Sequence, residues 1–149
     1  MMMEVYIKKV LEGAMLPTKG TEDSAGMDLY AYMDDGSDHI WIEPGETAKI
    51  HTGIAMELPR RTFGAVFARS GLATKKGLRP ANCVGVIDSD YRGEIIVALH
   101  NDSTIRQMVC HGDRIAQMVV MPYVATELIE VEKLEDTERG EGGFGSTGQ

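Results

Sequence analysis

Residues 50–58 read IHTGIAMEL, in which Ile, Thr, Ile, Met and Leu occupy every second position. A period of two places such side chains on one face of an extended chain, so this stretch predicts a half-buried β-strand. The same pattern continues at residues 63–67, FGAVF. It returns at residues 126–134, TELIEVEKL, where we also expect a strand.

Near-continuous apolar runs at residues 95–99 and 115–124 are typical of strands buried on both faces. Turn signals rich in Gly, Pro and Asp separate the strand-like runs. Many short strands joined by turns favour an all-β domain built as a sandwich, a barrel or a jelly roll. One short helix is expected at residues 70–77, SGLATKKG, with Ser70 as its N-cap and Gly77 as its stop.

The apolar pattern ends at Glu135, and residues 138–148 read ERGEGGFGSTG. Such a sequence cannot build a core, so we expect a mobile glycine-rich arm. The chain is therefore divided into one β domain at residues 1–134 and an arm at residues 135–149. A length of 149 residues suits this single domain.

The formal net charge of −8 argues against a nucleic-acid polymer as partner, because such binding relies on Lys and Arg neutralising phosphates. A single nucleotide remains compatible, since a few arginines and a divalent cation can hold a triphosphate. Cys83 and Cys110 lie in apolar surroundings without the close spacing of a zinc site, which predicts buried reduced thiols. No signal region or long apolar run is present, so a cytoplasmic protein without a membrane partner is expected.

The first candidate for chemistry is GVIDSDYRG at residues 85–93. One of Asp88 and Asp90 could face a ligand while the other supports the loop. Tyr91 offers a flat ring for stacking on a base or a sugar. The alternative is a polar hairpin with a buried tyrosine.

Two further segments carry arginines. Arg69 in ARSGLA can bond phosphate oxygens, and Ser70 with the amides behind it presents donors at a helix start. In the arm, Arg139 brings charge, Phe144 a stacking face, and the glycines amides that can wrap phosphates. The alternatives are an ordinary capped helix and a disordered terminus. No lysine follows the glycines, so the arm is not a Walker A loop.

The last two candidates sit between apolar neighbours. Asp28 in AGMDLYA is either a structural carboxylate or an outer-shell metal group. Gln117 in GDRIAQM either bonds neighbouring backbone or reaches a ligand.

In this order along the chain, the segments resemble the five sequence motifs of the trimeric dUTPase family. They read AGMDLYA, ARSGLA, GVIDSDYRGE, GDRIAQM and RGEGGFGSTG, and the resemblance spans residues 25–148. It implies a distorted jelly-roll or β-barrel domain with a flexible C-terminal arm, assembled as a homotrimer. Active sites would be shared between subunits, and the arm of one subunit would close over the site of a neighbour. The implied activity is hydrolysis of dUTP to dUMP and pyrophosphate by water attack at the α-phosphorus, which keeps uracil out of DNA and supplies dUMP for thymidylate synthesis.

The resemblance also implies a role for each residue. Asp88 would orient and deprotonate the attacking water, and Tyr91 would stack beneath the deoxyribose and exclude a 2′-hydroxyl. Asn82 would read the uracil edge together with hairpin backbone around Val86. Asp28 would act through water on Mg²⁺, which the substrate phosphates would mainly hold. Phe144 would stack over the uracil, and the phosphate region would be contacted by Arg69, Ser70, Gly71, Gln117, Arg139, Gly145, Ser146 and Thr147.

Departures from the family pattern lie outside these contact positions: Ala68 stands where proline is frequent, and Asp113 replaces a common glutamate. One alternative is a dCTP deaminase or a bifunctional deaminase–diphosphatase, which Tyr91 and the complete arm disfavour. Another is a dUTP-responsive regulatory binding protein, and the presence of Asp88 and Arg139 favours an enzyme over an inactive binding module.

Overall fold

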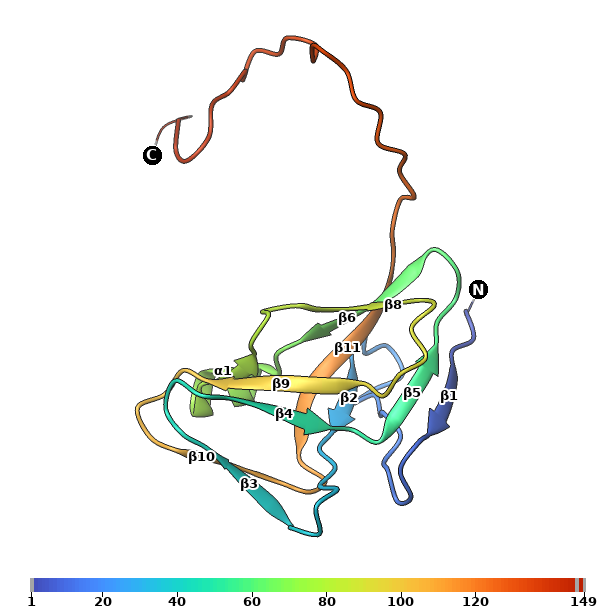
Figure 1. The fold of residues 1–149 in the computed structure, drawn as a ribbon, viewed down its shortest axis with the longest axis vertical. Coiled ribbons are helices and arrows are strands. Elements are labelled where there is room, and N and C mark those ends of the chain that lie inside the picture. The colour runs from blue at the N-terminus through green and yellow to red at the C-terminus, as the bar shows by residue number, and fades with distance from the viewer. Residues whose placement is uncertain (1, 147, 149) are drawn as a thin grey trace.

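A computed structural model describes residues 2–146 and 148 of the chain. Strands dominate this part, and the one helix in it is short, which confirms the predicted all-β class (Figure 1). The elements are β1 (Tyr6–Lys9), β2 (Met27–Tyr30), β3 (His39–Ile42), β4 (Thr47–His51), β5 (Ile54–Glu57), β6 (Thr62–Phe67), α1 (Ser70–Lys76), β7 (Leu78–Pro80), β8 (Gly85–Asp88), β9 (Ile96–Asn101), β10 (Gln107–Cys110) and β11 (Arg114–Pro122).

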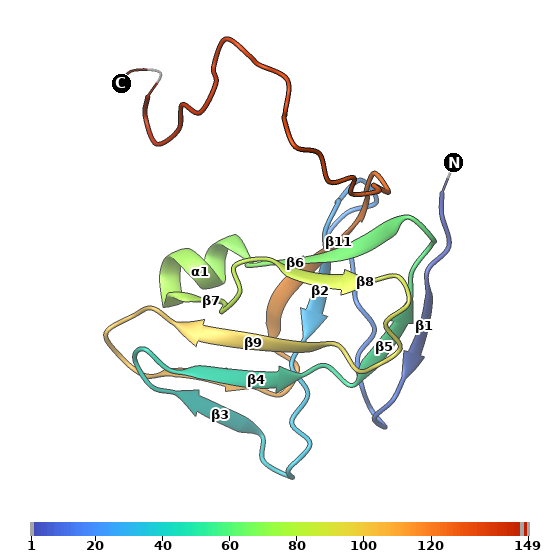
Figure 2. The same ribbon diagram turned by 45° about the horizontal axis from the view of Figure 1, so that its top comes forward.

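The strands form two larger sheets and two pairs, and all their pairings are antiparallel. One sheet has the order β2-β11-β6-β8, the other β4-β9-β7, and the pairs are β1-β5 and β10-β3. In Figure 2, β6 and β8 lie above β9 and β4. One apolar core draws buried side chains from both larger sheets, among them Leu29, Val66, Leu78, Val97, Leu99 and Met118. The arrangement is a distorted jelly roll whose two faces share that core.

The stretch at residues 50–58 folds as two strands, so the prediction of one continuous strand is corrected. β4 ends at His51 and β5 begins at Ile54, with Gly53 between them at a φ of 71°. That conformation suits glycine, and a Cβ at this position would also collide with the side chain of Ala14. At this break the chain changes its pairing partner: β4 pairs with β9, whereas β5 pairs with β1.

Two other strand predictions need correction. β9 alternates, with Val97 and Leu99 buried and Ile96 41% exposed, so it is not buried on both faces within one chain. Residues 126–134 form no strand, and Leu128 is 95% exposed. Their alternating pattern is present, but no neighbouring strand of the described chain accepts their backbone hydrogen bonds, and a strand needs such a partner.

Helix α1 begins at Ser70, and its N-cap is Arg69, with φ −85° and ψ 132° and no side-chain capping hydrogen bond. The predicted capping role of Ser70 is therefore wrong. The stop is confirmed, because Gly77 adopts the left-handed conformation and its N–H donates to Ala73. Another correction concerns the cysteines: both are unpaired, but Cys83 is exposed and Cys110 half-buried. No helix among the described residues is long and apolar enough to cross a membrane.

Candidate active site

Asp88 stands at the end of β8, where it is paired across the sheet with Phe63 of β6. The chain then turns, and the Tyr91 N–H donates to the Asp88 carbonyl at 3.1 Å. The Asp88 side chain is exposed and borders an open depression of about 720 Å³. This places an accessible carboxylate beside a space lined by charges of both signs, with the cations Arg60, Arg61 and Arg92 and the anions Glu57, Asp88 and Asp90.

The Tyr91 ring lies directly over the backbone of Gly93. Its hydroxyl donates to the Glu94 carbonyl at 2.9 Å, and any Cβ at Gly93 would collide with the ring. Tyr91 is still 44% exposed, so the alternative of a buried structural tyrosine is wrong. Together with Val86, itself exposed on β8, Tyr91 borders a second cavity of about 190 Å³ that also reaches Asp88. The hairpin thus presents a carboxylate and an aromatic face to adjoining spaces.

The base of this hairpin is tied to the β4–β5 corner through Glu94. The Glu94 carboxylate accepts hydrogen bonds from the Gly53 N–H at 3.1 Å and from His51 Nδ1 at 2.8 Å. The hydrogen bond from His51 to Glu94 raises the pKa of His51 above its ordinary value of 6.5, against the effect of burial, and the negative charges of Glu94 and Asp34 add to the increase. A charged histidine therefore strengthens the anchor of the segment that follows Tyr91.

Asn82 lies in the turn between β7 and β8 and is exposed. Its Nδ2 atom is close to Gly85, at 3.6 Å from the place where a Cβ would stand. The next residue, Cys83, has a φ of 64°, which costs a non-glycine residue about 1–2 kcal/mol. Asn82 therefore lies at the start of the edge strand β8, whose far end carries Asp88, and the turn that carries Asn82 is strained.

A second group of candidate residues forms on the opposite edge of the same sheet. Gln117 on β11 is paired with Asp28 on β2 and with Phe67 on β6. Its side-chain amide donates to the Ala68 carbonyl at 3.0 Å, and a Cβ on Gly26 would collide with its Oε1 atom. The glutamine thus forms a hydrogen bond to the backbone just before Arg69. Of the two roles expected for Gln117, the single chain shows the bond to neighbouring backbone.

Asp28 forms the centre of this group. Arg69 Nε donates to its Oδ1 at 2.8 Å, and Arg114 Nη1 lies 3.5 Å from its Oδ2. The guanidinium groups hold the carboxylate in place, and the exposed Ser70 and Gly71 follow at the start of α1. Arg69, Lys76 and Arg114 also border a cavity of about 220 Å³, so this edge of the sheet can attract an anion.

The charges around Asp28 indicate how this residue could contact the expected Mg²⁺ ion. Among the described residues no three His, Cys, Asp or Glu side chains gather as a metal site. Both Asp28 oxygens face arginines, so direct ligation would require an arginine to move, whereas a carboxylate retains lone pairs for a water. Asp28 thus fits an outer-sphere contact to a metal and does not fit direct coordination.

The two groups are separated along β6, because Asp88 is paired with Phe63 and Gln117 with Phe67. Four residues of strand correspond to about 13 Å. In a single chain, Val86, Asp88 and Tyr91 therefore lie together at the β8 edge of the sheet, and Asn82 lies on the same edge before the start of β8. The other group comprises Asp28, Arg69, Ser70, Gly71 and Gln117.

The arm joins neither group. After Pro122 the chain leaves the sheets and projects away from the domain (Figure 1). Arg139 Nε donates to the Gly142 carbonyl within the arm at 2.9 Å, while Phe144 is fully exposed. Gly145 and Ser146 are exposed as well, and the predicted contact residue Thr147 lies outside the described residues.

Gly93 was expected from the sequence to permit tight geometry in this loop, and it does lie against the Tyr91 ring. Two supporting residues were not predicted: Glu94 as the anchor of the hairpin, and Arg114 as the second cation on Asp28. Arg114 belongs to the segment that carries Gln117, but a register shift lies between Arg114 and Ala116 in the pairing with β2. No residue pattern marks that irregularity, so the direction of the arginine could not be foreseen. For Glu94, the available signal was its place three residues after Tyr91, at the end of the segment GVIDSDYRGE.

An all-β domain with an exposed carboxylate beside arginines has the chemical groups that a phosphoanhydride hydrolase would use. The model of the dUTPase family matches residues 12–148, and the chain belongs to this family. It is 52% identical over 144 residues to a deoxyuridine 5′-triphosphate nucleotidohydrolase of Desulfitobacterium hafniense, covering 96% of this chain and 93% of that protein. A protein of the same name from Nautilia profundicola is 46% identical, covering 99% of this chain and all of the other.

Solved structures agree with this assignment. The dUTPase of Staphylococcus bacteriophage 80alpha bound to dUpNHpp superposes with a TM-score of 0.82 at 28% identity, covering 98% of this chain and 99% of that one. A mutant dUTPase from phage phi11 of S. aureus, which coordinates a structural Mg(II) ion, gives a TM-score of 0.77 at 25% identity, covering 89% of this chain and 99% of that one.

Proposed function

We propose that this chain is a dUTP diphosphatase that hydrolyses dUTP to dUMP and pyrophosphate by attack of water on the α-phosphorus. Membership of the dUTPase family supports the activity, as do relatives named deoxyuridine 5′-triphosphate nucleotidohydrolase that span nearly the whole chain. The observation that carries the mechanism is the exposed Asp88 carboxylate beside the half-open face of Tyr91. The reaction removes a precursor of uracil in DNA and supplies dUMP for thymidylate synthesis.

In this proposal Asp88 accepts the proton of the attacking water and orients it toward the phosphorus. The carboxylate is accessible on a hairpin that is fixed on both sides, by β6 and by the Glu94 anchor. Fixed geometry of this kind is what a general base requires, because the proton must lie within hydrogen-bond reach. Tyr91 stacks beneath the deoxyribose, Asn82 reads the uracil edge, and the Val86 backbone borders the base. Cytosine is rejected because its exchanged donor and acceptor would leave polar groups of the pocket unpaired.

The phosphate contacts are assigned to the second group, which includes Arg69, Ser70, Gly71 and Gln117. Because this group lies about 13 Å along the strand from Asp88 in the same chain, we propose that a neighbouring subunit supplies it. A homotrimer with a three-fold axis would form such composite sites three times over. The exposed apolar side chains of one chain, such as Ile96, are compatible with burial between subunits.

We assign the C-terminal arm, residues 135–149, to the closure of a neighbour's site, with residues 1–134 as the β domain. Arg139 would reach the terminal phosphate, Phe144 would stack over the uracil, and Gly145, Ser146 and Thr147 would donate to phosphate oxygens. The support is the full exposure of Phe144 and the absence of apolar core residues in the described part of the arm. A segment that is ordered only by substrate can exclude water at the moment of reaction.

Mg²⁺ is the proposed cofactor. The related phi11 enzyme coordinates a structural Mg(II) ion, and Asp28 of this chain suits an outer-sphere contact through water. The ion would neutralise charge on the triphosphate and fix its geometry. Arg69 and Arg114 would then hold Asp28 in place whether or not substrate is bound.

The alternatives have less support. A dCTP deaminase or a bifunctional deaminase–diphosphatase is not favoured by the relatives that match across the whole chain. A purely regulatory dUTP-binding protein is not favoured either, because the carboxylate, the tyrosine and the arm residues are all present. We place the enzyme in the cytoplasm, where its unpaired cysteines would remain reduced.

The experiment that tests the function is pyrophosphate release from dUTP, UTP, dCTP and dTTP in parallel, with Mg²⁺. We expect dUTP to be turned over far faster than the others, and Asp88→Asn to lose about 10²–10⁴-fold in kcat. Asp90→Asn is the matched control, because Asp90 borders the same depression and has no assigned chemistry. Comparable rates for dCTP or dTTP would overturn the assignment of dUTP as the substrate. Full activity of Asp88→Asn would overturn the role of Asp88 as the general base.

A further inference from the structure

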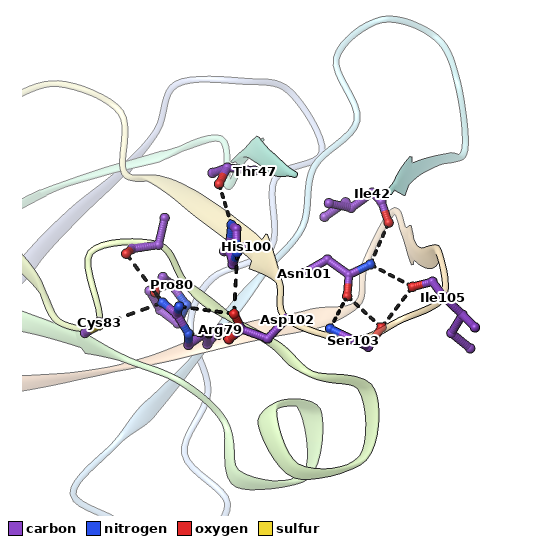
Figure 3. A network of polar contacts seen from close by, with 11 residues as sticks. Ile42, Thr47, Arg79, Pro80, Cys83, His100, Asn101, Asp102, Ser103 and Ile105 are labelled. Atoms are coloured by element: carbon purple, nitrogen blue, oxygen red, sulfur yellow. Dashed lines mark hydrogen bonds and ion pairs between the residues drawn. The ribbon is translucent and has the colours of Figure 1, made fainter. Parts of the chain in front are cut away.

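Arg79 on β7 joins Asp102, which follows β9, to the turn that follows β7 (Figure 3). Its side-chain contacts add to backbone hydrogen bonds between the two segments, such as that from the Ala81 N–H to the Ala98 carbonyl at 2.8 Å. The Arg79 Nε donates to Asp102 Oδ2 at 2.5 Å and its Nη2 to Asp102 Oδ1 at 3.3 Å. The remaining nitrogen, Nη1, points to the turn after β7: it donates to the carbonyls of Pro80 at 3.1 Å and Ala81 at 3.4 Å, and lies 3.8 Å from Cys83 Sγ. The guanidinium group therefore contacts the residues on both sides of Asn82.

The far side of this bridge is itself fixed. Asp102 Oδ1 lies 3.4 Å from His100 Nε2, and the other ring nitrogen of His100 is 2.9 Å from Thr47 Oγ1. Arg79 and His100 face each other across the β7–β9 pairing. Figure 3 shows the chain of contacts from Thr47 on β4 through His100 and Asp102 to Arg79. The arginine thus anchors the turn to the sheet β4-β9-β7.

The turn needs such an anchor because its backbone is irregular. Cys83 is left-handed, and the Cys83 N–H returns to the Pro80 carbonyl that Arg79 also contacts. The Val84 N–H donates to the Asn82 carbonyl at 2.7 Å, so the backbone of Asn82 is also tied to the residue two positions further on. A left-handed non-glycine residue persists where surrounding contacts determine it, and such residues gather at functional sites.

We propose that Arg79, held by Asp102, is a positioning residue that fixes the Asn82 turn for recognition of the uracil base. This inference rests on the proposed function, in which Asn82 reads that base. A lysine cannot replace the arginine, since one ammonium group cannot span the carboxylate and both carbonyls at once. Loss of the bridge widens the range of conformations of the turn. Affinity for the uracil base and preference for dUTP over dCTP should then decline, whereas the rate of the chemical step at Asp88 should stay the same.

The test compares Arg79→Met and Arg79→Lys with the wild-type protein. Steady-state kcat and KM are measured for dUTP, kcat/KM for dCTP and dTTP, and Tm for each variant. We expect Arg79→Met to raise KM for dUTP about tenfold with kcat within about twofold, and to lower the preference for dUTP over dCTP about tenfold. Arg79→Lys should recover only part of the loss. Asp102→Asn, which keeps the shape of the anchor and removes its charge, should change the preference in the same direction.

Arg106→Met is the matched control, because it removes the same charge from an arginine that stacks 4.3 Å from the centre of the Trp41 ring, away from the turn. It should leave KM and base preference unchanged. An unchanged base preference in Arg79→Met together with a lowered Tm would show a merely structural arginine and overturn the inference. Should Arg79→Met fail to fold, Asp102→Asn decides by the same two measurements.

A double-mutant cycle separates this inference from the proposed function. If Arg79 acts through Asn82, Arg79→Met should change base preference by less than about twofold in an Asn82→Ala background. If Asn82→Ala lowers the preference and Arg79→Met does not, the role of Arg79 is overturned and the proposed role of Asn82 stands. If Asn82→Ala has no effect on base preference, both assignments fall.

Discussion

The hydroxyl of Tyr91 donates to the backbone carbonyl of Glu94, three residues further along the same loop, at 2.9 Å. The bond folds the tyrosine back over Gly93, and the side chain remains 44% exposed. The same glutamate anchors the loop through its carboxylate, so ring position and loop position depend on one residue.

Gly93→Ala should disturb the ring of Tyr91 directly. A Cβ at this position would overlap the tyrosine ring, which must then move away from residue 93. We expect KM for dUTP to rise about tenfold or more in a protein that remains folded. The control is Gly20→Ala, whose Cβ would meet only the Ser24 hydroxyl at 3.6 Å. An unaltered KM in Gly93→Ala would show that the sugar does not rest on this ring.

Tyr91→Ala should relax the choice of sugar. If the ring lies beneath the deoxyribose, its removal opens space for a 2′-hydroxyl, and UTP turnover should rise relative to dUTP. Tyr91→Phe keeps the ring and loses only the hydrogen bond to Glu94, so it should retain most of the discrimination. The measurement is the ratio of kcat/KM for the two nucleotides. Equal ratios in Tyr91→Ala and the wild type would remove the tyrosine from this role.

Deletion of residues 139–149 should leave the folded β domain intact. No described residue of this segment belongs to the core, and Phe144 is fully exposed. Turnover of dUTP should fall at least about a hundredfold, because the site would remain open to water. Circular dichroism and the solution mass report on fold and assembly. An unfolded truncant, or one that no longer assembles, would contradict closure as the main role of the arm.

Stability should depend on pH through His51. Its pKa is raised in the folded state by the hydrogen bond to Glu94, so its contribution is fully present below about pH 6.5 and is lost as pH rises through the raised value. The apparent free energy of unfolding of the wild type, relative to His51→Gln at one fixed chain concentration, should therefore decline across that range. Asp34, 3.5 Å from His51 Nε2, should add to the effect. Glu94→Gln should flatten it, and parallel stability curves for wild type and His51→Gln would refute this linkage.

Asn101→Ala should cost about 2–4 kcal/mol of unfolding free energy. The buried Asn101 amide donates to the carbonyls of Ile42 and Ile105, and its oxygen accepts from the Ser103 N–H (Figure 3). Truncation leaves these backbone groups without partners. Gln107→Ala removes an amide that is only half-buried and should cost far less. Denaturant titration measures both, and equal costs would argue against the buried network as the cause.

The parts of the fold that depend on local pattern were predictable from the sequence. Period-two alternation indicated strands, and Gly77 marked the end of the helix, because only the local backbone conformation decides these features. The break at Gly53 was missed because it depends on the approach of Ala14, a contact distant in sequence. The strand predicted at residues 126–134 was wrong because periodicity reports suitable side chains and not the presence of a pairing partner.

The candidate site was predictable as a set of residues but not as an arrangement. Asp88, Tyr91, Arg69 and Gln117 could be selected by chemical type and resemblance. Their division into two groups depends on register along β6, which no single stretch of sequence contains. The supporting contacts, such as that of Arg79 with the Asn82 turn, were not predicted either. An arginine on a short strand is usually interpreted as a side chain whose charge is exposed to solvent.

In the proposed trimer, the arm of one subunit closes the site that contains Asp88 of another subunit. This division of the site between chains has a genetic consequence. Chains with Asp88→Asn and chains without the arm are each inactive alone, yet they lack different parts. If the two chains assemble at random in equal amounts, about a quarter of all sites in the population would combine an intact carboxylate with an intact arm from different chains. Two defective alleles expressed together would then complement each other, whereas two defects placed in one chain would not.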